Sequence, residues 1–265
     1  MMAKSGFARW LGFVLVAVST VFPLTLLTVM SFSRAWFYPE IVPSEWTAAN
    51  WSLLVTGRTV LSSALFTSIA LAASAGFIAA MIGLPAGRAI AALTGWSRRS
   101  AVALVFLPVA LPPLAVAVGL DYSLLLGGLG GSFTGVLLAH VVPALGYTTL
   151  FFIGVFAVFD RRVEEEARSL GASPREVLWK VTIPVLRRPL VEAFALAFLV
   201  SWAQVPLTLL IGQGIVRTLP LELMAYVGAG QDHLAATVGL VLAIPPLILL
   251  GAVGFASRKI PVVIA

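Results

Sequence analysis

The sequence predicts an all-α polytopic membrane protein with six transmembrane helices and a cytoplasmic helical elbow between the fourth and the fifth. Three observations support this fold class. Of the 265 residues, 60% are apolar and only 11% are charged, whereas a soluble domain carries about 25% charged residues. Six apolar runs reach the length of about 20 residues that a membrane-spanning helix needs. The basic residues also gather in segments that a single topology places on one side of the membrane.

The six runs define one transmembrane domain, residues 1–265, whose core spans extend over about residues 58–256. The first run follows basic residues, as in a secretory signal peptide, but it is about twenty residues long, whereas the apolar region of such peptides usually has about 7–15. We therefore expect this run to be retained as a helix. The predicted spans lie near residues 7–30, 60–83, 101–120, 133–159, 190–212 and 234–256.

The distribution of basic residues orients these spans. Of the 17 Lys and Arg residues, only Arg34, Arg58 and Arg217 fall in loops that the topology places outside, and the other 14 fall on the cytoplasmic side. Positive charge is retained on the cytoplasmic side during insertion. The imbalance predicts that both termini are cytoplasmic. It also explains the net charge of +6 by membrane topology, so no nucleic-acid partner is expected.

The first outer loop, residues 31–58, is rich in aromatic side chains, which favour the membrane–water interface. Two interpretations stay open for this loop: an interfacial anchor in the lipid, or a docking surface for an external partner. Its aromatic residues are Trp36, Phe37, Tyr38, Trp46 and Trp51.

The sequence lacks the motifs of nucleotide-binding, hydrolytic and metal-dependent proteins. No glycine is followed by lysine, so the phosphate-binding pattern G-x-x-x-x-G-K-[ST] is absent, and neither G-x-S-x-G nor H-E-x-x-H occurs. There is no cysteine, and the two histidines, His140 and His233, are far apart. We expect no catalytic residue, cofactor or metal site in this chain, so any ATP must be bound by another chain.

Ionisable residues are sparse within the predicted spans. Asp121 lies at the outer end of the third span, and His140 lies in the fourth, near Pro143. An ionisable group inside the membrane is a functional candidate, but a neutral histidine here would more simply bond a backbone carbonyl freed by the proline. The sparseness argues against a proton- or sodium-coupled pump, which needs buried carboxylates along its path.

The charged segment 160–189 predicts two short helices joined by a tight turn. The first covers about residues 161–170, where pairs of opposite charge at i, i+4 each contribute about 0.2–0.5 kcal/mol. Gly171 suits the left-handed position that ends a helix. In the second helix, Ser173 and Glu176 form a capping box, and the helix is expected to stop before Pro184. The predicted ion pairs are Arg161–Glu165, Arg162–Glu166 and Glu164–Arg168.

The segment resembles the cytoplasmic loop of permease subunits of bacterial ATP-binding-cassette (ABC) importers, the binding-protein-dependent inner-membrane components. The pattern of that loop is E-A-A-x-x-x-G-x(9)-I-x-L-P. Residues 165–167 (Glu-Glu-Ala) stand at E-A-A, Gly171 follows after three residues, and residues 181–184 (Val-Thr-Ile-Pro) stand at I-x-L-P. Glu166 in place of the first alanine and the aliphatic exchanges at 181 and 183 are mild departures.

The resemblance extends over nearly the whole chain and is similar to the branch that serves spermidine, putrescine, ferric iron, thiamine and aminoethylphosphonate. It implies a bacterial inner-membrane permease that is not an enzyme and moves a small solute by alternating access. The implied partners are a second permease chain, with a heterodimer favoured, an external solute-binding protein, membrane lipid, and two cytoplasmic ATPases that bind ATP and Mg. The implied ATPase-coupling residues are Glu165, Glu166, Ala167, Gly171, Ser173, Val177, Leu178, Val181 and Pro184, with the apolar ones seated in an ATPase groove.

The fifth predicted span offers the best candidates for lining the solute path. Ser201, Gln204 and Thr208 are polar, and their spacing places all three on one helical face. The alternative is that they bond a neighbouring helix. No carboxylate accompanies them, which weakens the case for a cationic solute within this chain. A secondary carrier or channel without an ATPase is the alternative function, but it would leave the elbow unexplained.

Overall fold

The computed structural model describes residues 2–36, 39–57 and 59–257. Phe37, Tyr38 and Arg58 of the predicted outer loop, and Arg258 and Lys259 near the C-terminus, lie outside the described residues. The described chain is helical apart from its loops and one two-stranded hairpin. It divides into two compact units, one formed by residues 1–65 with 218–265 and the other by residues 66–217.

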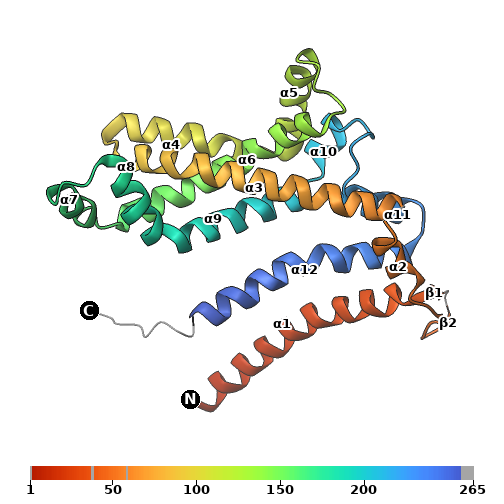
Figure 1. Cartoon of the computed structure of the whole chain (residues 1–265). Coiled ribbons are helices and arrows are strands. Elements are labelled where there is room, and N and C mark those ends of the chain that lie inside the picture. Colours follow the sequence, from red (N-terminus) through yellow and green to blue (C-terminus); the bar gives the residue numbers. More distant parts are fainter. Residues whose placement is uncertain (1, 37–38, 58, 258–265) are drawn as a thin grey trace. The chain divides into compact units, whose positions relative to one another are not determined.

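The first unit is built on two long helices, α1 (Met2–Ser31) and α12 (Asp232–Ser257), which pack against each other (Figure 1). Helix α11 (Leu219–Gly228) also packs on α12. Between α1 and the short helix α2 (Ala49–Val55), strand β1 (Ser33–Ala35) pairs antiparallel with β2 (Glu45–Trp46).

The described part of the aromatic loop that the sequence places outside is folded. The side-chain amide of Asn50 is buried and donates to the backbone carbonyls of Ser31 at 2.9 Å and Ser33 at 3.0 Å. The rings of Phe32 and Trp51 stack with their centroids 5.7 Å apart. Trp46 remains 61% exposed on β2. The loop therefore presents an aromatic side chain on an ordered support.

The second unit has the central helix α6 at its core. Helix α6 packs against α4, α9 and α10 (Figure 1). Buried side chains from α3 complete this core. Only the part of α3 from Phe66 onward belongs to this unit. Its elements are α3 (Val60–Ala92), α4 (Gly95–Ala110), α5 (Pro113–Leu126), α6 (Phe133–Val158), α7 (Arg162–Ser169), α8 (Pro174–Val177), the π-helix η1 (Leu178–Thr182), α9 (Ile183–Trp202) and α10 (Pro206–Ile211).

Helices α3 and α6 approach each other closely through small residues. A Cβ atom added at Gly83 would lie 2.5 Å from Thr148 Oγ1, and one added at Gly87 would lie 2.5 Å from Phe152 Cβ. Thr148 Oγ1 donates across this contact to the carbonyl of Ala79 at 2.8 Å. Small residues four apart are typical of membrane helices whose backbones pack closely. The two helices are therefore tightly joined.

The described residues contain four helices long and apolar enough to cross a membrane, or five if one bent pair forms a single span. The bent pair is α4 and α5, which meet at 98° and coincide with the predicted third span. Leu111 and Pro112 are extended there, and Pro113 starts α5. A proline disfavours helix at the residue before it, so two consecutive prolines break the span.

The predicted fifth span is also not one straight apolar helix. Helix α9 begins at Ile183, carries Arg187, Arg188 and Glu192 in its first half, and ends at Trp202. Helix α10 starts only at Pro206. The break matters for the site, because it separates residues that the sequence places on one face.

Candidate functional site

The elbow has the capped turn that the sequence predicts. Gly171 has a φ of +90°, and the hydrogen bonds Ala172 N to Ala167 O and Gly171 N to Arg168 O, of 3.1 and 2.9 Å, form a Schellman motif at the end of α7. At the start of α8, Glu176 N donates to Ser173 Oγ at 3.3 Å. In return, Ser173 N donates to Glu176 Oε2 at 3.0 Å. Both halves of the capping box are present.

The carboxylate of Glu176 is held in its charged form. Lys180 Nζ lies 2.9 Å from Glu176 Oε1. This hydrogen bond, followed by those from the backbone N–H and the hydroxyl of Ser173 and by the Lys180 charge, lowers the pKa of Glu176 to about 2. The capping box therefore keeps its negative charge throughout the physiological pH range.

Two expectations for the elbow are wrong. None of the three predicted i, i+4 ion pairs around α7 is among the ion pairs of the described residues. Glu164 instead pairs with Arg88. The helix also does not stop before Pro184. Ile183 N donates to Leu178 O, five residues back, and the wide turn η1 runs on into α9. A π-turn shifts the carbonyl that would otherwise collide with the proline ring, so the helix continues.

The predicted coupling residues lie on different sides of the elbow. Glu165, Glu166, Gly171, Ser173 and Pro184 are exposed, whereas Ala167, Leu178 and Val181 are partly buried. Val177 is only 2% exposed and packs inside this chain, so it is not free to enter a partner's groove.

The two most exposed large apolar side chains of the elbow are not among the residues that the sequence predicts. Leu170 is 88% exposed and Trp179 is 68% exposed. Leu170 adjoins the helix-ending Gly171, and a large apolar residue beside such a turn is a signal that could have identified it. Trp179 lies in η1, where the extra residue per turn shifts the helical phase and so defeats a prediction based on period.

The three polar residues of the fifth span do not share one face. Ser201 lies at the end of α9 and Thr208 lies in α10, and both are buried. Their hydroxyls contact opposite nitrogens of one ring, with His140 Nδ1 at 2.8 Å from Ser201 Oγ and His140 Nε2 at 2.9 Å from Thr208 Oγ1. The expectation of a single face is wrong because residues 203–205 interrupt the helix.

His140 thus bonds side-chain hydroxyls, and not the backbone carbonyl expected near Pro143. The ring is 1% exposed. A neutral imidazole has one donor nitrogen and one acceptor nitrogen, and a hydroxyl can serve either. The network is therefore satisfied without a charge, and it holds the two halves of the broken helix against α6.

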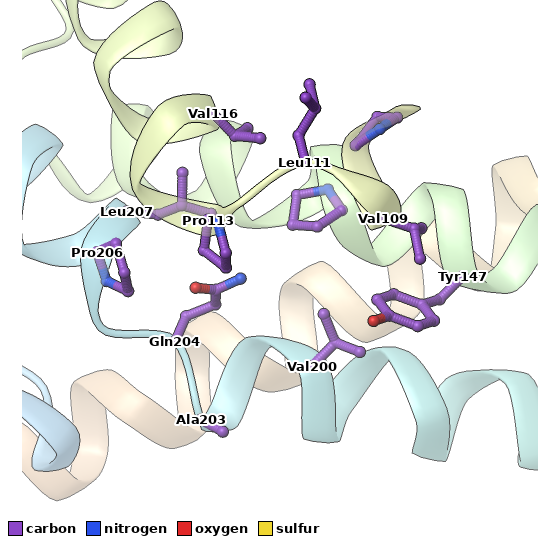
Figure 2. A pocket seen from close by; sticks show the side chains of 12 residues that line it. Val109, Leu111, Pro113, Val116, Tyr147, Val200, Ala203, Gln204, Pro206 and Leu207 are labelled. Atoms are coloured by element: carbon purple, nitrogen blue, oxygen red, sulfur yellow. The ribbon is translucent and has the colours of Figure 1, made fainter. Parts of the chain in front are cut away.

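Gln204 lies apart from this network and lines a pocket of about 310 Å³ (Figure 2). Tyr147 and Gln204 are the polar side chains among its lining residues, and the remainder are apolar and include four prolines. Figure 2 shows the Gln204 amide below Pro113, with the Tyr147 ring near Val200. The pocket offers hydrogen-bonding groups without a formal charge.

Comparison with known proteins shows one family over most of the chain. Residues 79–260 match the family described as "Binding-protein-dependent transport system inner membrane component". The molybdenum transport system permease protein ModB of Mycobacterium tuberculosis is 30% identical over 76% of this chain and 81% of its own. The spermidine/putrescine permease PotC of Haemophilus influenzae is 25% identical over 86% and 88%. The putative 2-aminoethylphosphonate permease PhnV of Salmonella typhimurium is 28% identical over 86% of each.

Solved structures show the same fold. A bacterial ABC transporter that imports alginate matches with a TM-score of 0.64, at 16% identity, over 95% of this chain and 96% of the other. The same fold recurs in a bacterial alginate ABC transporter in complex with an alginate pentasaccharide-bound periplasmic protein, at a TM-score of 0.63, with 13% identity and 96% of each chain covered.

Proposed function

Because the chain belongs to the family of binding-protein-dependent transport system inner membrane components, we propose a mechanism in which its elbow receives motion from an ATPase. The chain is a permease subunit of an ABC importer and a transport subunit of the inner membrane. Its solute is delivered by an external binding protein. The chemistry of ATP, with its Mg, belongs to two ATPase subunits, and a second permease completes the path.

The proposed topology has six spans in a single permease domain, with both termini in the cytoplasm. Four spans correspond to α1, α3, α6 and α12, each with an apolar stretch long enough to cross the membrane. The bent pair α4–α5 forms the third. The fifth combines α9 with α10, whose interruption is bridged by the His140 network. Breaks of this kind are tolerated in a membrane where side chains satisfy the freed backbone or a cavity adjoins it.

The elbow is the proposed contact with the ATPase, and its exposed apolar residues carry this proposal. Leu170 and Trp179 are large apolar side chains on a short, capped structure that is otherwise strongly charged. Apolar anchors surrounded by charged residues are typical of the centre of a protein interface. The exposed carboxylates of Glu165 and Glu166 would lie at the rim of this contact. A secondary carrier would have no use for such a surface.

The pocket beside the broken fifth helix is the proposed part of the solute path. Gln204 and Tyr147 would exchange hydrogen bonds with a passing solute, while Ser201 and Thr208 hold the break through His140. The names of the relatives cover molybdenum, spermidine or putrescine, and aminoethylphosphonate, which differ in charge. The pocket offers hydrogen bonds but no charged partner, so its contact with the proposed small solute, such as a polyamine, thiamine, ferric iron or an aminoethylphosphonate, would be weak. Selection is then left to the binding protein.

Co-purification tests the proposed ATPase contact. The chain is expressed with the candidate ATPases of its own genome and captured in detergent. Trp179→Ala is expected to weaken recovery of the ATPase, because a large exposed anchor is lost. Trp46→Ala, on the aromatic loop of the first unit, is the matched control and should leave recovery unchanged. If no ATPase is recovered with the unmodified chain, or if both variants behave alike, the elbow is not the docking surface.

A further inference from the structure

An ion pair between a buried carboxylate and a partly exposed guanidinium joins the elbow to helix α3. Arg88, near the end of α3, contacts Glu164 in α7 with both ends of its guanidinium group. Nη1 lies 2.9 Å from Oε1 and Nη2 lies 2.5 Å from Oε2. The Glu164 side chain is 4% exposed and that of Arg88 is 35% exposed. Paired N–H···O bonds of this kind fix direction as well as distance.

The same carboxylate holds a third element. Thr182 Oγ1, at the end of η1, donates to Glu164 Oε1 at 2.5 Å. The Arg88 guanidinium also lies over the ring of Phe156 in α6, with its central carbon 5.7 Å from the ring centroid. One buried carboxylate therefore connects α3, α7 and η1, and its partner contacts α6. Helix α3 is far from the other elements in the sequence, since Arg88 and Glu164 are 76 residues apart.

The carboxylate is charged in the folded protein. Burial raises the pKa of Glu164, but hydrogen bonds from Thr182 and Arg88, together with the charges of Arg88 and Arg168, lower it more, and the net shift is downward. A buried charge that loses one partner is costly, because the other charge stays uncompensated. The contact is therefore a firm attachment and not a surface ion pair that solvent can separate.

The ion pair attaches the elbow to α3, a helix that does not adjoin the elbow in the chain. Helix α7 follows α6, and η1 runs into α9, so α6 and α9 are continuous in the chain with the elbow. Helix α3 is not; it packs on α6 near Gly83 and Gly87, and the Arg88–Glu164 pair joins it directly to α7. From this geometry we infer that Arg88 is a positioning residue of the coupling machinery: through Glu164 it makes α3 follow the elbow when the ATPases move it. The inference rests on the proposed function and names the residues that extend the motion to α3.

The absence of cysteine allows a direct test by spin labelling. Cysteines at Ala89 on α3 and Ser169 on α7, both exposed, report the distance between α3 and the elbow by pulsed EPR. A second pair at Met81 and Leu138 reports the packing of α3 on α6. The chain is measured in lipid nanodiscs alone, and again in complex with its ATPases, nucleotide-free and trapped with ATP and vanadate.

The unmodified chain is expected to give one narrow Ala89–Ser169 distance that is the same in both nucleotide states. Glu164→Gln should broaden the distribution of Ala89–Ser169 distances and should let its mean differ between the two nucleotide states. Thr182→Val removes only one donor and should give a smaller broadening, which keeps the test decisive if Glu164→Gln fails to fold. Glu192→Gln removes the exposed ion pair with Arg188 and is the matched control without effect. The Met81–Leu138 distance should stay constant throughout.

Measurements of ATPase recovery and ATP hydrolysis separate a coupling role of Arg88 from a purely structural one. Arg88→Lys keeps the charge but loses the two-pronged contact. It should retain ATPase recovery and ATP hydrolysis while losing the stimulation of hydrolysis by the loaded binding protein. A native Ala89–Ser169 distance that changes between nucleotide states, or a Glu164→Gln distribution like the native one, would overturn the inference. Failure to recover any ATPase would instead overturn the proposed function, and the nanodisc measurement on the chain alone would still decide whether the attachment is rigid.

Discussion

Substitution of Gly171 tests how much the left-handed backbone at this position contributes to the elbow, without changing side-chain packing. Gly171 has a φ of +90°, and a Cβ atom added there would meet nothing within 4 Å. The cost of Gly171→Ala is therefore one of conformation alone, roughly 1–2 kcal/mol for a residue with a Cβ in the left-handed region. This cost corresponds to about a 5- to 30-fold increase in the population of the opened elbow.

Limited proteolysis measures that population. Arg168 and Arg175 flank Gly171 and are exposed, so trypsin cuts the elbow when its turn opens. Where opening and closing are fast relative to cleavage, the rate of cutting follows the opened fraction. Gly171→Ala should therefore be cut about 5- to 30-fold faster. Gly171→Asn should be cut at an intermediate rate, since asparagine tolerates the left-handed region better.

A glycine without this conformation provides the control. Gly154 lies in the helical interior of α6 with open space around it. Gly154→Ala should leave cutting at the elbow unchanged, because alanine favours a helix and meets no atom. Equal cutting of the native chain and Gly171→Ala would show that the left-handed conformation of Gly171 does not control opening of the elbow, as would faster cutting of the Asn variant than of the Ala variant.

Two further predictions concern the capping box and the histidine network. The pKa of Glu176 is lowered to about 2. The stability that the Glu176 carboxylate gives the elbow is therefore complete above the unfolded pKa of about 4.3 and is lost as pH falls from there toward 2. The protease resistance of the elbow should fall in that pH range, and Glu176→Gln should remove this pH dependence. His140→Leu leaves the Ser201 and Thr208 hydroxyls without their partner and should lower the free energy of unfolding by about 1–2 kcal/mol, measured by thermal unfolding in detergent. This loss should shrink when Ser201→Ala and Thr208→Val are added. Additive losses would contradict the hydrogen-bond network around His140.

Local patterns in the sequence predict the parts of this protein whose partners lie nearby in the chain. The capping box depends on Ser173 and Glu176, three residues apart, and the turn depends on a single glycine, so both could be read directly. Hydropathy likewise located the long helices, because a span is a property of one segment. These features need no knowledge of the rest of the fold.

The contacts that the sequence did not reveal join distant segments. Glu164 has Arg168 one helical turn away, yet its carboxylate turns to Arg88, because a buried pair with two hydrogen bonds outweighs an exposed pair on one helix. The spacing of Ser201 and Thr208 predicts a shared face only in a continuous helix, and residues 203–205 interrupt this one. Only the tertiary position of His140 shows that they converge on one ring from two helices.

In the proposed function, ATP hydrolysis on a partner drives this permease through its elbow. The most direct measurement is uptake into proteoliposomes that contain the chain with the ATPase recovered alongside it, supplied with solute on its binding protein. Uptake is expected when ATP reaches the ATPase, and none is expected when ATP is withheld, even with a proton or sodium gradient imposed. Uptake by the chain alone, driven by such a gradient, would contradict it.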